Sequence, residues 1–162
     1  MKRNEDNNEY CYEGVKNLSR QKCSKLSVDD IFSLDIVIIP INHYNIHWTL
    51  VVIYMEEKRI QSYDSMHNDQ VENVRVIMRY LQDEWRDKKP GVEEPDWDKW
   101  NLVFNDPQTP RQRKNVDCGL FASLIANFIS IGLPLSFSQD HVNANTREKF
   151  ALSILKNCLI YK

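Results

Sequence analysis

The sequence has 162 residues, 42% hydrophobic and 27% charged, with 4 Gly and 6 Pro, proportions that fit one globular domain and exclude collagen, coiled coil and bulk disorder. Twenty-one Lys and Arg against 23 Asp and Glu give a formal net charge of −2, which argues against nucleic acid as a partner. The apolar runs are far shorter than the roughly 20 residues that span a bilayer, and the N-terminus lacks an apolar signal segment, so we expect neither membrane insertion nor secretion.

The first third of the chain predicts a polar start followed by β-strands. Residues 1–10 are polar without periodicity and predict a disordered or frayed segment. Residues 11–33 have weak helical spacing, and Ser27, Asp29 and Asp30 before Ile31 predict a short helical turn. The β-branched runs 34–41 and 47–55 predict strands buried on both faces, and 60–65 predicts a third strand in a hairpin with the second. These three strands are expected to form the centre of a sheet.

The remaining elements alternate between helices and one further strand. Residues 69–86 predict an amphipathic helix with Asp69 as its N-cap, ending before the KKPG segment, and 100–104 predict a strand. Residues 118–130, with Asp117 as N-cap, and 145–159 predict two more helices. This order predicts an α+β domain over residues 11–162, with a sheet packed against helices and no internal repeat.

Cys118 is the most informative position in the chain. The four cysteines, at positions 11, 23, 118 and 158, have no C-x-x-C spacing and are too few for a disulfide scaffold, which favours a reducing compartment. Three of them fit core filler or surface thiols. Cys118 opens an apolar helix, where the helix dipole favours a thiolate and therefore a nucleophile. A small buried residue that begins a core helix remains the alternative.

His47 and Asp64 supply a possible base and the group that orients it. His47 opens a strand, and Asp64 ends the strand expected to pair with it. A turn centred between Met55 and Glu56 would place the two residues directly opposite each other. The polar turn favours a centre at residues 57–58, which sets Asp64 opposite Val51, about 13 Å along the strand from His47, so that a bulge, twist or longer loop must bring them together. Asp64 also fits a plain turn residue. The other histidines, at positions 43, 67 and 141, are expected to be structural.

Two further residues have both a functional and a plain interpretation. Gln112 lies in a loop six residues before Cys118, where its amide and the Cys118 N–H are suited to hold an oxyanion; a solvated side chain is the alternative. Trp48 follows His47 and fits either a core residue or part of a substrate site.

The combined motifs resemble one family. HW at 47–48, YDS at 63–65 and P-x-Q-x-x-x-x-D-C-G-x-F-A at 110–122 occur in the order and with the separations of the SUMO/sentrin-specific (Ulp/SENP) cysteine proteases. The resemblance extends from about residue 12 to 159. It implies a papain-like α+β peptidase, without metal or organic cofactor, that acts as a monomer on a SUMO-like protein and its conjugates in the nucleus or cytoplasm.

The resemblance also implies a role for each site residue. Cys118 would be the nucleophile, His47 the general base, Asp64 its orienter and Gln112 the oxyanion donor, while Trp48 would cover the C-terminal glycines of the substrate. The expected reaction is cleavage after the C-terminal glycine of the modifier, in maturation or in release from lysine. The alternatives are an inactive family member that binds modifiers without cleaving them, a protease for another modifier such as a NEDD8-like protein, or an unrelated fold.

The sequence departs from the family at two places. Family catalytic domains begin upstream with a Trp-Leu-Asn-Asp-like segment and helices that bind the modifier and supply a second tryptophan, and the sequence contains none of these. We therefore expect a domain that lacks its N-terminal part. Lys114 stands four residues before the cysteine, where the family commonly has Asn.

Overall fold

The computed structural model describes residues 10–16 and 30–156. The predicted N-terminal segment 1–10, apart from Tyr10, lies outside these ranges, as do Cys23 and Cys158. The short helical turn predicted from the residues before Ile31 is a 3-10 turn, η3, at Ile31–Ser33. The Asp30 carboxylate accepts from the Phe32 N–H at 2.9 Å. The main elements are β1 Ile36–His43, β2 His47–Tyr54, β3 Arg59–Tyr63, α1 Val71–Lys88, β4 Asn101–Val103, α2 Cys118–Ser130 and α3 Ala144–Lys156.

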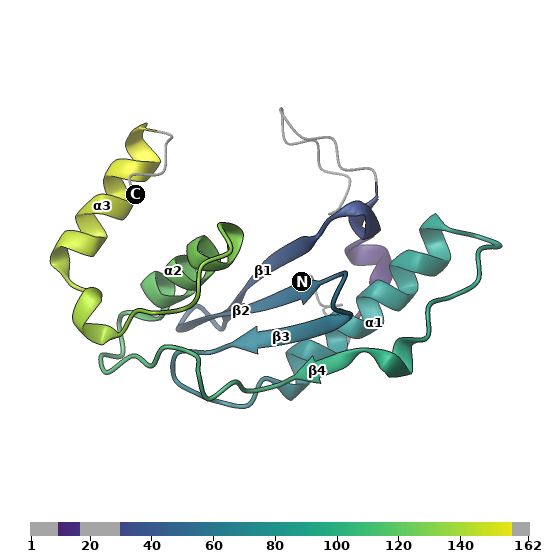
Figure 1. The fold of residues 1–162 in the computed structure, drawn as a ribbon, viewed down its shortest axis with the longest axis horizontal. Coiled ribbons are helices and arrows are strands. Elements are labelled where there is room, and N and C mark those ends of the chain that lie inside the picture. The colour runs from purple at the N-terminus through teal and green to yellow at the C-terminus, as the bar shows by residue number, and fades with distance from the viewer. Residues whose placement is uncertain (1–9, 17–29, 157–162) are drawn as a thin grey trace.

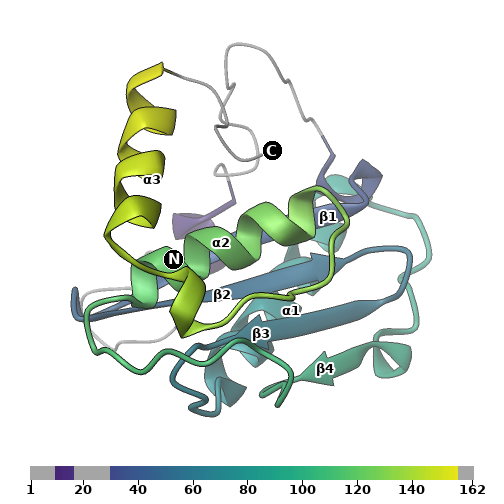
Figure 2. The ribbon, with the colours of Figure 1, turned by 60° about the vertical axis from the view of Figure 1, so that its left-hand side comes forward.

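The four strands form one mixed sheet in the order β1-β2-β3-β4. β1 and β3 both pair antiparallel with β2, whereas β4 pairs parallel with β3. Helix α1 covers one face of this sheet and α2 the other, as the two views in Figure 1 and Figure 2 show. The α+β class, the mixed sheet and the β2–β3 hairpin are confirmed.

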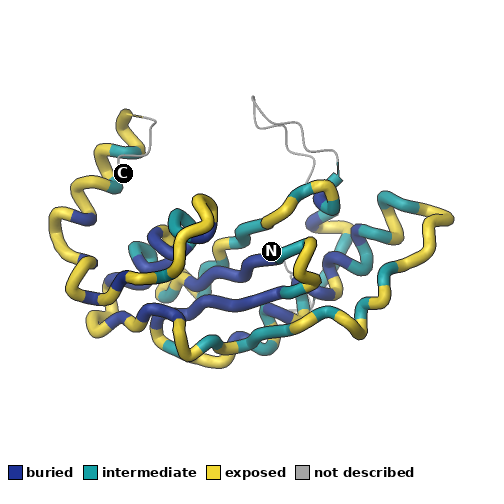
Figure 3. The backbone as a smooth tube through the Cα atoms, viewed as in Figure 1, coloured by how far each residue is buried: buried dark blue, intermediate teal, exposed yellow. Residues whose placement is uncertain are grey.

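The central strand β2 contributes to a core on each face of the sheet. Because side chains alternate along a strand, Val51 and Ile53 pack in the core that contains α1, and Leu50 and Val52 pack in the core that contains α2. All four are at most 2% exposed, and the burial colouring of β2 and β3 shows this continuous buried centre (Figure 3). The prediction of a strand buried on both faces therefore holds for β2.

The same prediction was wrong for β1. Its residues are exposed or half-buried throughout, and Ile36 is 37% exposed. β1 is an edge strand with β2 as its sheet neighbour, so it is not at the centre of the sheet. Pro40 fits this position, since proline has no backbone N–H to donate to a ladder and is therefore found on edge strands.

The prediction that Asp69 caps α1 was wrong, whereas Asp117 stands at the N-cap of α2 as predicted but makes no side-chain capping bond. Asp69 does not cap α1, whose N-cap is Gln70 without a side-chain cap bond; the Asp69 carboxylate instead accepts from the Asn105 amide at 3.2 Å. Asp117 stands at the N-cap of α2, but its backbone is in the helical region and its carboxylate does not bond to the first turn. Asp69 lies one residue before the N-cap position, and the helical backbone of Asp117 differs from the extended conformation of a side-chain-capping residue. Helix α1 also starts and ends two residues later than predicted.

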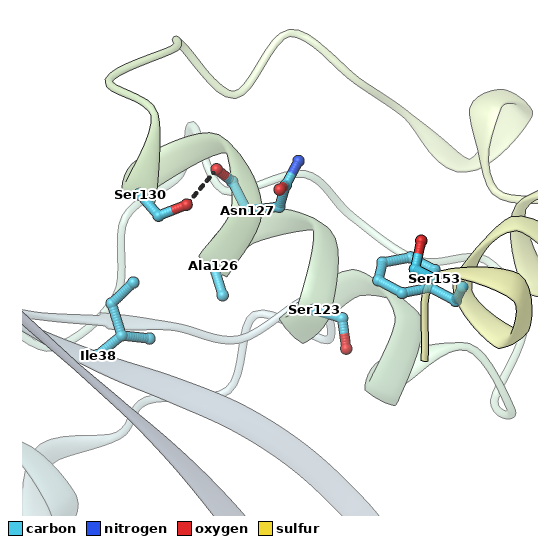
Figure 4. A pocket seen from close by; sticks show the side chains of 7 residues that line it. Ile38, Ser123, Ala126, Asn127, Ser130 and Ser153 are labelled. Atoms are coloured by element: carbon cyan, nitrogen blue, oxygen red, sulfur yellow. Dashed lines mark hydrogen bonds between the residues drawn. The ribbon is translucent and has the colours of Figure 1, made fainter. Parts of the chain in front are cut away.

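Helix α3 stands at one end of the molecule and is mostly exposed (Figures 1 and 3). The 145–159 prediction is confirmed for the described part of this helix. Its apolar stripe is only partly covered: Phe150 is half-buried, whereas Ile154 and Leu155 are 79% and 81% exposed. Between α2, α3 and β1 lies a hollow of about 280 Å³, shown with its lining side chains in Figure 4.

Candidate active site

The β2–β3 hairpin brings His47 and Asp64 together. His47 is the first residue of β2, and Asp64 follows the last residue of β3. The turn spans Met55–Lys58, with the Lys58 N–H donating to the Met55 carbonyl at 3.2 Å. This register pairs Leu50 with Tyr63 and, continued by one residue, sets Asp64 opposite Thr49, two residues closer to His47 than the expected position. The diagonal is closed by a 2.7 Å hydrogen bond between His47 Nε2 and Asp64 Oδ1.

Asp64 is buried but surrounded by hydrogen-bond donors. Its side chain is 2% exposed, and besides His47 it accepts from the backbone N–H of Met66 at 2.8 Å, from Asn68 and from the Gln70 side chain at 2.9 Å. Burial alone raises the pKa of Asp64, but the hydrogen bonds from Met66, His47 and Asn68 outweigh it and hold the pKa below its usual value. Asp64 is therefore an anion at neutral pH. The turn interpretation also holds, since its carbonyl accepts from the His67 N–H at 2.9 Å.

The carboxylate fixes the tautomer of the imidazole. An ionised carboxylate only accepts hydrogen bonds, so Nε2 of His47 must carry a hydrogen. In the neutral ring the lone pair is then on Nδ1. The His47 side chain is 14% exposed and its ring stacks on that of His43 with the centroids 5.8 Å apart. His47 is thus arranged as a base: the Asp64 carboxylate fixes one edge of its ring, and the His43 ring packs on one face.

The other three histidines have structural partners. His43 Nε2 lies 2.8 Å from Thr49 Oγ1, and His67 Nε2 lies 2.8 Å from the Thr109 carbonyl oxygen. The His141 ring accepts from the Ser138 N–H in a capping box around η5, the 3-10 turn Gln139–His141.

Cys118 is the first residue of α2 and is 7% exposed. The amides of the first helical turn have no acceptor within the helix, so the Cys118 N–H is free of the intrahelical ladder. Trp48, beside His47, packs against the next residue, Gly119: a β-carbon built on Gly119 would lie 3.6 Å from Trp48 Cδ1. This contact joins the start of β2 to the start of α2.

Trp48 is not a core residue. Its side chain belongs to the exposed apolar residues of the chain, at 42%, so the core interpretation was wrong. Further exposed apolar side chains stand within two residues of the site positions: Ile46 before His47, Met66 after Asp64 and Val116 before Cys118. Each of these three site positions therefore has an exposed apolar neighbour in the sequence.

Gln112 is buried and anchored rather than solvated, so that interpretation was also wrong. It is 7% exposed, its Oε1 accepts from the Ser65 hydroxyl at 2.6 Å, and its backbone N–H donates to the Ser65 carbonyl at 2.9 Å. Nε2 donates to the Lys114 carbonyl at 2.8 Å, which uses one of the two hydrogens on that nitrogen. Ser65 follows Asp64, so the same turn that holds the carboxylate also holds Gln112.

Motif spacing missed several residues that shape this site. Gln70 and Asn68 bind Asp64, and Ser65 binds Gln112. Gln139 and Arg147 bind the Asp117 carboxylate from 22 and 30 residues downstream. Ser65 belongs to the YDS motif, and Asn68 and Gln70 follow it closely, which was the available signal for these three. The motif spacing did not indicate that Gln139 and Arg147 contact Asp117.

No group of three metal-ligating side chains occurs in the part of the chain that the structure describes. Among the same residues, no helix has both the length and the apolarity needed to cross a membrane. The hollow of Figure 4 is a separate feature, since its walls are Ile38 and residues of α2 and α3 other than Cys118.

Comparison with known proteins identifies the family. The "Ulp1 protease family, C-terminal catalytic domain" matches residues 1–159. The chain belongs to the Ulp1 protease family. Ubiquitin-like-specific protease 1A of Arabidopsis thaliana is 37% identical over 108 residues, which cover 67% of this chain and 21% of the relative. Sentrin-specific protease 2 of Pongo abelii is 30% identical over 132 residues, covering 81% and 22%. The chain thus spans about a fifth of these relatives.

The fold is also that of the Ulp1 family. An X-ray structure of the C-terminal Ulp1 protease domain, in complex with the yeast SUMO ortholog SMT3, superposes with a TM-score of 0.69 at 26% sequence identity. The match covers 90% of this chain and 61% of that domain. The fold predicted from the resemblance is therefore confirmed.

Proposed function

We propose that this chain is a thiol-dependent protease that cleaves after the C-terminal glycine of a SUMO-like modifier, to mature a precursor or to release the modifier from a lysine. The observation that carries the proposal is the 2.7 Å contact between His47 Nε2 and an ionised Asp64. Membership of the Ulp1 family and the SUMO-bound structure of a relative support the substrate class. A reducing compartment, the nucleus or cytoplasm, is the proposed setting.

The proposed first step forms a thioester. The Cys118 thiolate attacks the glycine carbonyl carbon, and the electron pair of the C=O bond moves to oxygen. The Cys118 N–H and the second Nε2 hydrogen of Gln112 are the donors for this oxyanion. As the tetrahedral intermediate collapses, the C–N bond breaks and the His47 imidazolium gives its Nδ1 proton to the leaving amine.

The proposed second step releases the modifier. Neutral His47 takes a proton from water at Nδ1, and the hydroxide attacks the thioester carbon. The C–S bond breaks, which restores the Cys118 thiolate and leaves His47 as the imidazolium, and it frees the modifier as a terminal carboxylic acid whose proton passes to solvent. Asp64 keeps its negative charge throughout and stabilises the imidazolium form of His47.

Trp48 is the proposed roof of the substrate channel. An indole over a narrow slot admits a Gly-Gly tail and excludes residues with side chains. Its position against Gly119, next to the proposed nucleophile, and its partial exposure support this role.

The test uses SUMO, NEDD8 and ubiquitin probes that carry a C-terminal electrophile. We expect a SUMO adduct with the unaltered chain and with Cys11→Ser, a matched control because Cys11 is a free, half-buried cysteine. Cys118→Ser should abolish the adduct. A NEDD8 adduct in place of a SUMO adduct would replace the proposed modifier, and SUMO binding by the folded chain without an adduct would indicate a non-catalytic binding module.

A further inference from the structure

The two proposed oxyanion donors stand at opposite ends of one loop. Gln112 opens the 112–117 segment, and Cys118 follows it as the first residue of α2. Donors of this kind stabilise an oxyanion only when they are held about 3 Å from the place where its charge develops. The conformation of the 113–117 stretch therefore sets the separation of the two donors.

The Gln139 side chain contacts both ends of this stretch. Its Oε1 accepts from the backbone N–H of Arg113 at 2.7 Å, directly after Gln112. Its Nε2 donates to Asp117 Oδ2 at 2.9 Å, directly before Cys118. Gln139 is 7% exposed and Asp117 4%, so water does not readily replace either bond.

The amide of Gln139 is also held in one orientation. Nε2 makes a second contact of 3.3 Å with the Val142 carbonyl oxygen. Both sides of the amide therefore have partners, and a flip would place its NH₂ against the Arg113 N–H and its oxygen against the Asp117 carboxylate. Such a flip would set a donor against a donor and an acceptor against an acceptor.

Arg147 of α3 reinforces the same end of the loop. Its Nη2 donates to Asp117 Oδ1 and to the Val116 carbonyl oxygen, the latter at 3.1 Å. Each oxygen of the Asp117 carboxylate thus has a partner from the 139–147 region. This is why Asp117 does not cap α2, although it stands at the N-cap.

We propose that Gln139 is a positioning residue that fixes the distance between the Gln112 amide and the Cys118 N–H, and thereby the geometry of the oxyanion site. The inference rests on the proposed function, because the oxyanion in question is the one that forms when Cys118 attacks the glycine carbonyl. Gln139 acts through the loop and does not touch the reacting atoms. Its effect should appear in reactions that pass through a tetrahedral oxyanion and not in a direct substitution in which the sulfur attacks an alkyl carbon.

The first test compares two reactions of the same thiol in Gln139→Met. For cleavage of a fluorogenic SUMO C-terminal amide we expect kcat to fall about 10- to 100-fold, with KM within about twofold. This fall is at most about as large as the fall in kcat when one oxyanion donor is removed. Alkylation of Cys118 by iodoacetamide forms no oxyanion, so its rate and pH profile should stay unchanged. Gln108→Met is the matched control, since Gln108 is an exposed glutamine of the preceding loop.

A compensating swap keeps the inference testable if Gln139→Met folds poorly. Gln139→Glu alone sets two carboxylates against each other and should lose activity. In Asp117→Asn/Gln139→Glu the asparagine NH₂ donates to the new carboxylate, and Arg147 keeps an oxygen acceptor. We therefore expect kcat to be at least about tenfold higher than in Gln139→Glu. Asp117→Asn is measured as well, which completes the double-mutant cycle.

The outcomes separate the two proposals. Unchanged kcat in Gln139→Met, an equal fall in cleavage and alkylation, or no recovery in the swap would overturn the role of Gln139 while leaving the proposed function intact. No cleavage by the unaltered chain would instead overturn the proposed function and the inference with it.

Discussion

His47 and Asp64 face each other diagonally across one hairpin, joined at 2.7 Å although the ladder does not pair them with each other. The four-residue turn at Met55–Lys58 produces this diagonal, because it sets the register that carries Asp64 to within two residues of the position opposite His47. Residues two apart on a strand share a face. The contact therefore depends on backbone geometry and requires no bulge.

Removing the charge of Asp64 should slow cleavage without weakening binding. In Asp64→Asn an amide replaces the carboxylate, so the imidazolium of His47 loses its counter-charge and the Nε2-protonated tautomer is no longer enforced. We expect kcat to fall about 10²- to 10⁴-fold with little change in KM. Asp69→Asn changes an exposed carboxylate five residues after Asp64 and is the control for steady-state kinetics. A loss confined to KM would contradict this role.

Asp64 should also give stability a pH dependence of known sign. Burial raises its pKa, but the donors around it lower it by more. A group with a depressed folded-state pKa stabilises the fold above its unfolded value, about 4, and this contribution is lost as the pH falls through the folded value. Asp64→Asn should therefore be less stable than the unaltered chain at pH 7, with the difference shrinking below about pH 4. Urea unfolding from pH 7 to pH 3 measures this, and a difference constant over that range would refute it.

Trp48 should matter for cleavage and not for folding. Because its side chain is 42% exposed, Trp48→Ala should change Tm little. Loss of the indole should lower kcat/KM for a SUMO substrate about 10- to 100-fold, from about 1–3 kcal/mol of lost contact. Ile131→Ala removes a similarly exposed apolar side chain just after α2 and should leave both quantities unchanged. A large fall in Tm with full activity would assign Trp48 to the fold.

Tyr12 should stabilise the fold without taking part in the reaction. Its hydroxyl donates at 2.7 Å to the carboxylate of Glu84, which is 1% exposed within α1. Burial and this hydrogen bond raise the pKa of Tyr12. Tyr12→Phe leaves a buried carboxylate short of one donor, so we expect the free energy of unfolding to fall by about 1–3 kcal/mol with unchanged kcat.

Tyr44→Phe is the control for that change, since Tyr44 is 81% exposed and its hydroxyl should be dispensable. Equal stability of the two variants in denaturant titrations would contradict the importance of the buried bond.

Local periodicity was sufficient to predict the elements of the fold. β2, α1 and α2 carry apolar side chains at the spacing of their own structures, so their existence followed from the sequence. The exposure of β1 did not follow from the sequence, because its β-branched run resembles that of β2. The two differ in that β1 pairs with one strand and β2 with two among the described residues.

The site was predictable where the chain places its parts in motifs and not where distant segments meet. The positions of His47, Asp64 and Cys118 followed from residue type and place within an element. The partners of Asp117 did not, since Gln139 and Arg147 are 22 and 30 residues away. The missing capping bond of Asp117 was not predictable for the same reason, because residue type alone does not reveal which distant side chains bind a carboxylate.

The hairpin also divides the proposed triad by sequence distance. Asp64 follows His47 by 17 residues, whereas Cys118 follows Asp64 by 54. A threefold longer connection raises the entropic free-energy cost of loop closure by about 1 kcal/mol. This longer loop is closed by the packing of α2 on the sheet and not by strand pairing. The His47–Asp64 pair is thus a local unit that forms with the hairpin, whereas the position of the Cys118 thiol depends on the packing of α2 against the sheet. A local opening that separates α2 from the sheet would therefore abolish cleavage by Cys118 while the His47–Asp64 hydrogen bond stays intact.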